Sequence, residues 1–381
     1  MKRNFFAGGM TPTGFVDFFE HIMPLHAAHK RYFLKGSSGA GKSTFIKKIA
    51  AEVFGGDGDF FHCANDPTSL DAFAAQNFCI IDATHPHSRD PEIPAAVDEI
   101  IDFAKFLDAK KILPHLEEIK KISREKKNFY AEAQRILSAA KFLCTENSRA
   151  AETRINPADF QSHATRKLFL GALTPDGIKN FADDVLSRYD VFDINAPAAA
   201  LPLFADCNVA GMSSQACATS REKSAFGAEF FFCPLTMKMI HIVLPREGIA
   251  FATCGGRFGY TGKIAENVDF SQEKTANSRG NFGGNSRSYA DDSHEKNANS
   301  RGGFGGNSRN NAVDSQEKNA NSRTAAREDA ITDVILDAAF EAMKSAREAH
   351  EKIEKIFASA MNFSEVDKFA KKIIKNLKFQ K

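Results

Sequence analysis

The segment Tyr32–Ala50 reads Tyr-Phe-Leu-Lys-Gly-Ser-Ser-Gly-Ala-Gly-Lys-Ser-Thr-Phe-Ile-Lys-Lys-Ile-Ala. Its first four residues, Tyr32–Lys35, are typical of a buried strand, and Lys42–Phe54 has the apolar spacing of an amphipathic helix. A glycine-rich loop joins the two. A strand followed directly by such a loop and a helix predicts an α/β fold.

The loop itself fits the phosphate-binding pattern GxxxxGK[ST] in full, in the strand–loop–helix context that the pattern requires. Its glycines let the backbone wrap phosphate groups with the N–H groups pointing inward, and the helix that follows adds positive partial charge. We expect Lys42 to contact the β- and γ-phosphates and the Ser43 hydroxyl to bind Mg²⁺. The candidate nucleotide-binding residues are Gly36, Ser37, Ser38, Gly39, Ala40, Gly41, Lys42, Ser43 and Thr44.

A second acidic group is expected at the end of a buried strand, where ligands bind in open α/β sheets. Asp82 ends the apolar run Phe78–Asp82 and would hold Mg²⁺ through water, as a Walker B acid does, unless it only caps the strand. Ala83 and Thr84 follow, in place of the glutamate with which many ATPases polarise water.

The next side chains able to orient a nucleophile are two histidines, His85 and His87. We take His85 as the catalytic candidate with His87 as its alternative, and either is also explained as a loop residue. Arg89 would neutralise transition-state charge or remain a solvated loop residue. His62 and Cys63 do not complete a four-ligand set with these histidines, so no zinc site is expected.

Part of the chain repeats itself. Asn4–Phe19 matches Lys167–Ala182, and Asp59–Cys63 matches Glu229–Cys233 in the same order. Two separate matches in one order indicate a duplicated domain. Two unrelated domains that share turn residues are the alternative.

A younger repeat of 22 residues begins at Asp269, returns at Asp291 and ends with a partial copy from Val313. It is rich in Asn, Ser, Gly and Arg, and such a composition buries too little apolar area to offset the loss of chain entropy. We therefore expect a disordered insertion over residues 265–324. From Asp269 to Arg323, eight Lys or Arg residues face seven Asp or Glu residues, so RNA binding is not expected.

Five segments are predicted in all. Tyr32–Ala83 and its flanks form a nucleotide-binding core at 1–108. A helical appendage is predicted at 109–162, because apolar residues recur at helical spacing in a pattern that runs from Ala95 to Ala150. A second core follows at 163–264, then the insertion at 265–324, and a helical segment at 325–381. Thr11-Pro12 has the pattern of a helix N-cap followed by proline at the first helical position.

Composition excludes several classes of protein. The 381 residues carry a formal net charge of +2, so no strong field draws the chain to nucleic acid or to an anionic membrane. No apolar run is long enough to span a bilayer, and Gly, Thr and Pro break the N-terminal apolar stretch, so no signal peptide is expected. Seven cysteines without a CxxC pair predict reduced thiols and a cytoplasmic location.

Taken together, the segments Phe5–Phe15, Phe33–Thr44, Phe61–Asp71 and Ile80–His87 resemble a family of tandem P-loop ATPase-like proteins, uncharacterised bacterial proteins described mostly as ATP-binding or ATPase. The resemblance covers most of the chain apart from the 22-residue repeats. It implies a P-loop NTPase-like parallel sheet covered by helices, present twice, with ATP bound at Gly36–Thr44. The second copy departs from the family pattern, because Asn195–Ala200 lacks Gly-Lys-Ser and Ala252-Thr253 replaces the acid.

The leading functional hypothesis is an Mg²⁺-dependent ATPase with one working site, in which Lys42 stabilises the phosphates and Ser43 and Asp82 organise the metal. ATP is favoured over GTP by the resemblance alone. The first alternative is a P-loop kinase that uses Asp66 or Asp71 to receive the proton of an acceptor. The second is a nucleotide-dependent switch or scaffold without useful turnover, with a protein partner or self-association through the helical segments.

Overall fold

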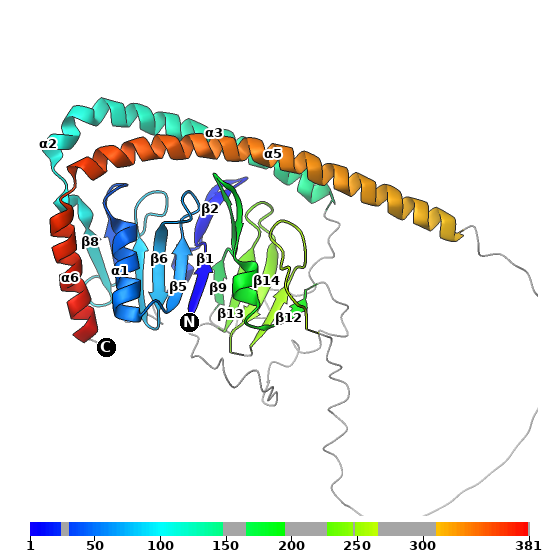
Figure 1. Cartoon of the computed structure of the whole chain (residues 1–381), viewed down its shortest axis with the longest axis horizontal. Coiled ribbons are helices and arrows are strands. Elements are labelled where there is room, and N and C mark those ends of the chain that lie inside the picture. Colours follow the sequence, from blue (N-terminus) through cyan, green and yellow to red (C-terminus); the bar gives the residue numbers. More distant parts are fainter. Residues whose placement is uncertain (24–29, 148–164, 195–226, 247, 266–309, 380–381) are drawn as a thin grey trace, which may run out of the picture.

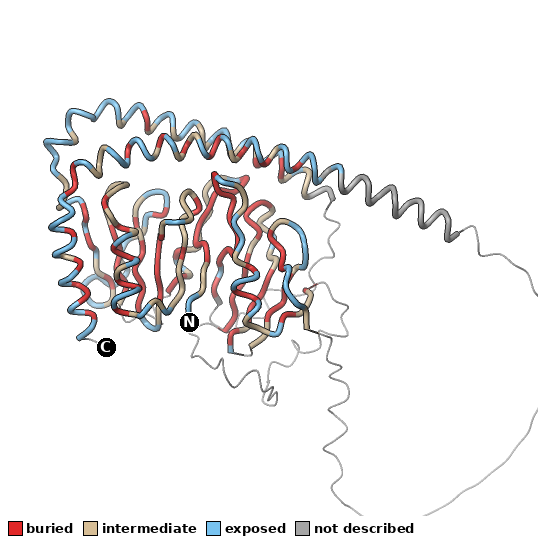
Figure 2. Tube along the Cα trace, viewed as in Figure 1, coloured by how far each residue is buried: buried red, intermediate tan, exposed pale blue. Residues whose placement is uncertain are grey.

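The computed structural model describes residues 1–23, 30–147, 165–194, 227–246, 248–265 and 310–379. Two β-sheets lie next to each other, and two long helices pass across one edge of both (Figure 1). Buried residues concentrate in the strands of both sheets, whereas the outer helices are buried along one side only (Figure 2). None of the helices in these ranges combines the length and apolar character that crossing a membrane requires.

The first sheet has six strands in the order β1-β5-β6-β7-β4-β8. They are β1 (Lys2–Phe5), β4 (Lys30–Lys35), β5 (Gly58–His62), β6 (Leu70–Ala75), β7 (Phe78–Asp82) and β8 (Asp98–Asp102). β6 runs antiparallel to both of its neighbours, while the other pairs are parallel. The sheet is therefore mixed, and the expectation of a parallel sheet is wrong in this respect. The cause is the tight connection between β6 and β7 through Gln76, whose φ of 50° is left-handed, because so short a link joins only antiparallel strands.

The second sheet has five strands in the order β12-β15-β14-β13-β9. They are β9 (Thr165–Leu168), β12 (Asp190–Asp193), β13 (Ala228–Phe232), β14 (Met239–Leu244) and β15 (Ile249–Ala252). The order and the pairing senses repeat those of β1, β4, β5, β6 and β7. Even the register irregularity recurs, between Phe61 and His62 in β5 and between Phe231 and Phe232 in β13.

A small hairpin follows the first strand of each sheet. β2 (Gly8–Thr11) pairs with β3 (Gly14–Asp17), and β10 (Gly171–Thr174) pairs with β11 (Gly177–Asn180). Thr11 therefore does not cap a helix, and the helix start that we predicted at Thr11-Pro12 is wrong. Its hydroxyl donates to the carbonyl of Gly14 at 2.8 Å and closes the turn, as Thr174 does with Gly177 at 2.7 Å.

The two sheets meet along β1 and β9. Phe6 and Phe169 exchange two backbone hydrogen bonds of 3.0 Å, and the ring of Phe5 stacks on that of Phe231 with centroids 5.9 Å apart. Beside them lie four charged side chains, two from each sheet, which we call the inter-sheet cluster: Arg3, Asp59, Arg166 and Glu229. One contiguous apolar core contains residues of both sheets, so the two sheets form one packed body.

Helices cover the first sheet on one face and cross the edge of both sheets. α1 (Lys42–Phe54) packs on β6 and β7, and α6 (Phe363–Phe379) packs on α1. α3 (Leu116–Asn147) and α5 (Asn310–Ala360) lie side by side over the edge (Figure 1). The remaining short helices are η1 (Phe19–His21), η3 (Phe103–Phe106), α2 (Ala109–Ile112), η4 (Leu113–His115) and α4 (Ala182–Leu186).

Two expectations about helices and disorder need correction. Residues 98–102, inside the stretch predicted as helical from Ala95, form β8, because Asp98 pairs with the buried Arg31 of β4 through bonds of 2.6 and 2.8 Å. Residues 310–324, expected to belong to the disordered insertion, form the first turns of α5. Extending an existing helix costs far less than nucleating one, so a weakly apolar stretch continues it. The rest of the insertion, 266–309, lies outside the described residues.

Candidate phosphate-binding site

The glycine-rich loop connects β4 to α1, as the sequence predicts, and α1 begins at Lys42. Gly36, Gly39 and Gly41 have φ values of 150°, 72° and 85°, a backbone region that side chains rarely adopt. Gly36 also lies against η3, where a Cβ atom would come within 2.8 Å of the Phe103 Cβ. These glycines therefore set the shape of the loop.

Lys42 lies buried inside this loop. Its Nζ donates to the carbonyls of Gly36 at 2.9 Å and Ser37 at 2.7 Å, and lies 3.6 Å from Asp82 Oδ2. The ammonium group thus sits between the loop and the carboxylate that ends β7, the strand next to β4. The Ser37 hydroxyl is buried without a hydrogen-bond partner, which leaves one polar group of the loop free for a ligand.

Ser43 and Asp82 are the two expected metal ligands. Ser43 Oγ accepts a hydrogen bond from the amide of Leu70 at 2.9 Å, and Asp82 Oδ1 accepts from the Thr84 hydroxyl at 2.6 Å. Among the described residues no group of three His, Cys, Asp or Glu side chains gathers as a metal site. Mg²⁺ usually takes one or two protein ligands together with substrate phosphates and water, and Ser43 with Asp82 fits that pattern.

Asp71 lies beside Asp82, because it precedes Ala72, the partner of Ile81 across β6 and β7. Burial raises the pKa of Asp71 to about 6, and the nearby Asp82 carboxylate adds to the rise. Cys63 lies near the same carboxylate, and the interaction with the Cys63 thiol acts in the opposite direction and lowers the pKa of Asp71. The antiparallel strand β6 thus brings a second acid to the edge where the phosphate loop lies.

His87 belongs to the same cluster, whereas His85 does not. The buried His87 donates from Nδ1 to the Asp82 carbonyl at 2.6 Å, stacks on Phe19 and places Nε2 3.9 Å from Asp71 Oδ1. His85 is exposed. Arg89 pairs with Asp17 and with Glu20, toward β3 and η1. The structure therefore places His87 next to Asp82 and Asp71. Arg89 instead forms ion pairs away from the phosphate loop.

α5 contributes residues that the sequence did not indicate. Ser38 Oγ lies 3.1 Å from Nε2 of His350, and Nδ1 of His350 lies 3.2 Å from the Lys126 ammonium of α3. Glu354, one turn further along α5, lies against Gly39. His350 and Glu354 are more than three hundred positions away from the loop in the sequence. No sequence pattern links them to it, so only the fold shows that they lie there.

The second sheet lacks these groups at the corresponding strand ends. Asp193 and Ala252 pair where β12 and β15 end, and Thr253 follows with its hydroxyl bonded to the Ile240 carbonyl at 2.9 Å. Residues 195–226, which would hold a loop after β12, lie outside the described residues.

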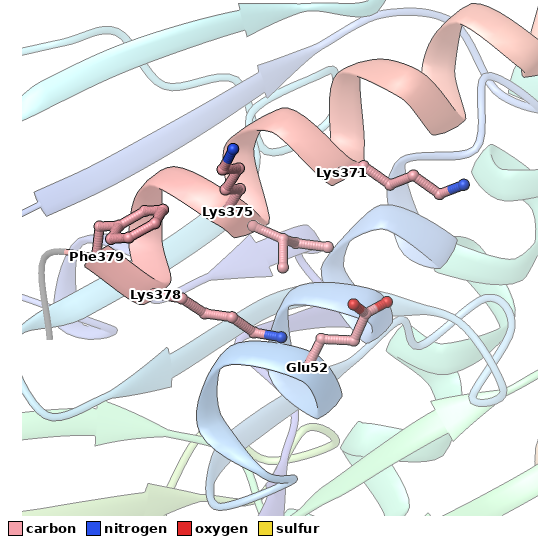
Figure 3. A pocket seen from close by; sticks show the side chains of 6 residues that line it. Glu52, Lys371, Lys375, Lys378 and Phe379 are labelled. Carbon is pink, nitrogen blue, oxygen red and sulfur yellow. The ribbon is translucent and has the colours of Figure 1, made fainter.

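A separate groove of about 400 Å³ lies between α1 and α6, where Lys378 of α6 extends toward Glu52 in the last turn of α1 (Figure 3). Its lining residues are Glu52, Lys371, Ile374, Lys375, Lys378 and Phe379. Because Lys42 begins α1 and Glu52 lies near its end, this groove and the phosphate loop occupy opposite ends of the same helix.

Comparison of the chain with models of protein families, with curated proteins and with solved structures found no match.

Proposed function

We propose that this chain binds ATP with Mg²⁺ at the loop Gly36–Thr44 and cleaves the γ-phosphate there, in a P-loop NTPase-like core. The observation that carries the proposal is the position of Lys42, held on loop carbonyls within 3.6 Å of Asp82. An ammonium poised between a glycine-rich loop and an acid at the next strand end suits a triphosphate with its metal. The choice of ATP over GTP rests on the family resemblance.

The residues at the loop fit the group that they would hold. The loop N–H groups and Lys42 would bind phosphate oxygens, and Ser43 and Asp82 would share the metal with them. When bound, Mg²⁺ neutralises charge that develops on the phosphates. The loop carbonyls that now accept from Lys42 show that its ammonium is already turned toward the cradle.

For hydrolysis, His87 replaces His85 as the residue that orients water. The Asp82 carbonyl only accepts, so Nδ1 of His87 carries the proton and Nε2 of the neutral ring presents a lone pair. The water oxygen would form a bond to the γ-phosphorus while Nε2 accepts a water proton. The bond from the γ-phosphorus to the β–γ bridging oxygen would break, and ADP and phosphate would leave.

A kinase is the second candidate, and Asp71 is the observation that favours it. A buried carboxyl group whose pKa is about 6 is suited to receive the proton of an acceptor hydroxyl near neutral pH. Asp66, the other acid that we considered, accepts hydrogen bonds from Thr68 and Ser69 and shapes its own turn instead.

We further propose that the second sheet is a degenerate copy of the first. The repeated strand order, pairing senses and register irregularity support a duplication. This copy would serve as a docking or regulatory partner. A switch or scaffold without useful turnover remains the non-enzymatic alternative, with protein partners or self-association through α3, α5 and α6.

The test is phosphate release from ATP by the purified chain, with and without Mg²⁺ and with no acceptor added. Release that disappears in Asp82→Asn supports hydrolysis at this site and argues against both alternatives. Tight ATP binding without release, followed by transfer to an added small-molecule hydroxyl acceptor, would favour the kinase. Binding without either reaction would favour the switch.

A further inference from the structure

α5 lies directly on the phosphate loop. A Cβ atom on Gly39 would come within 2.5 Å of the Glu354 carbonyl oxygen and 3.3 Å of the Ala358 Cβ. Only a residue without a side chain permits so close an approach of helix and loop. The start of α6 also reaches the loop, because a Cβ atom on Gly41 would lie 3.5 Å from the Phe363 ring.

Glu354 makes a polar contact with the loop as well. A Cβ atom on Gly39 would lie 3.0 Å from the Glu354 Cγ, and the Gly39 amide interacts with the Glu354 carboxylate and favours its charged form. Inward-pointing amides of a loop of this kind are the groups that bind phosphate oxygens. An anionic group of the chain itself therefore occupies a donor that a triphosphate would need.

The neighbouring residues of α5 strengthen this contact. Because the Lys126 ammonium only donates, Nδ1 of His350 accepts from it, and Nε2 then carries the proton that is donated to Ser38 Oγ. His350 and Glu354 are one helical turn apart, so one stripe of α5 contacts two successive loop residues.

We propose that Glu354 is an intramolecular occupant of the phosphate cradle, and that α5 must shift to admit a nucleoside triphosphate. This inference rests on the proposed function. Carboxylate and phosphate are both anionic and compete for the same amide, so the two do not share it. The apparent affinity for nucleotide is then lowered by the fraction of molecules in which the helix is closed.

The second sheet would hold this helix closed. Arg347 lies two helical turns before Glu354 on α5. It forms two bonds of 2.6 and 2.7 Å to Asp176 at the tip of the hairpin β10–β11. Arg257, in the segment after β15 of the second sheet, binds Asp329 and Asp333 nearer the start of α5. A copy without a phosphate loop of its own would thus regulate the loop of the first.

The test compares Glu354→Ala and Glu354→Gln with Glu348→Ala, which removes an exposed acid from the same helix. Without nucleotide, amide hydrogen exchange over Gly36–Thr44 should be faster in Glu354→Ala than in the control. Affinity for Mg-ATP, measured by calorimetry, should rise on the order of tenfold, because the carboxylate no longer competes with phosphate for the loop amide. Glu354→Gln, which keeps an acceptor but loses the charge, should lie between.

Unchanged exchange together with an affinity equal to that of Glu348→Ala would overturn the proposal and leave ATP binding intact. If neither the wild-type chain nor Glu354→Ala bound ATP, the proposal would fall together with the proposed function. The two failures are therefore distinguishable.

Discussion

Replacing Asp59 by asparagine should destabilise the junction between the two sheets. Arg3 donates two hydrogen bonds to Asp59, of 2.8 and 2.9 Å, and Arg166 donates a third of 2.5 Å. Glu229 is the other acid of the inter-sheet cluster and is fully buried, as is Arg166. Without Asp59, two guanidinium groups would face a single carboxylate.

The size of the loss follows from the pKa of Asp59. Burial alone would raise this pKa, but the charges of Arg3 and Arg166 lower it from 3.8 to about 2. A shift of nearly two pKa units corresponds to about 2 kcal/mol of stability. Breaking a buried pair also leaves an uncompensated charge, which brings the expected loss to about 3 kcal/mol.

Urea denaturation followed by circular dichroism measures this loss, since the chain has no tryptophan for fluorescence. The control is Asp57→Asn, because Asp57 is exposed and its ion pair with the N-terminal ammonium, at 3.1 Å, is screened by solvent. The loss in free energy of unfolding for this variant should stay below about 1 kcal/mol. The folded pKa of Asp59 is the lower one, so its contribution is complete above pH 3.8 and is lost as the pH falls through about 2. Equal losses for the two variants, at every pH, would refute the reasoning.

Three further changes test other parts of the account. Asp71→Asn should lower phosphate transfer to an added acceptor about 100-fold or more, with ATP affinity nearly unchanged by calorimetry, because it removes the proton acceptor of the kinase reaction and not a phosphate ligand. Full transfer activity would exclude that role for this acid. Asp98→Asn should reduce the free energy of unfolding by about 3 kcal/mol, since it leaves the buried Arg31 without its bidentate partner, and a loss below 1 kcal/mol in urea would contradict this. Asp176→Asn should release Arg347 and tighten Mg-ATP binding about threefold, as expected for loss of an ion pair of under 1 kcal/mol; a weaker affinity would show that α5 does not act as a lid.

The first core shows what local sequence can predict. The bounds of α1 were predicted as the structure has them, because the glycine loop, the apolar spacing and the terminal Gly55 all indicate the same helix. β6 was not predicted, since Leu70–Ala75 contains alanines and no β-branched residue. β8 was missed for another reason. Its acidic residues are typical of the exposed side of a helix, and only the neighbouring strand β4 shows that Asp98 pairs with Arg31.

The candidate site divides in the same way. Lys42, Ser43 and Asp82 are close in space because a motif and two adjacent strands place them there, so their grouping was predictable. The choice between His85 and His87 depended on which ring turns inward, which spacing alone does not reveal. Asp71 reaches the site through an antiparallel strand, and Glu354 through a helix more than three hundred residues away. Both depend on tertiary packing that no local pattern encodes.

The most direct test of the central claim is calorimetric titration of the chain with Mg-ATP, beside Lys42→Ala and Lys47→Ala. Lys47 is exposed on the same helix and donates to the Thr68 carbonyl, so its loss removes an equal charge away from the loop. We predict saturable binding by the wild-type chain and by Lys47→Ala, and a loss of at least about 100-fold in Lys42→Ala, because a charge-assisted contact to the phosphates is removed. Equal affinity in all three proteins, or no binding by the wild-type chain, would contradict the account.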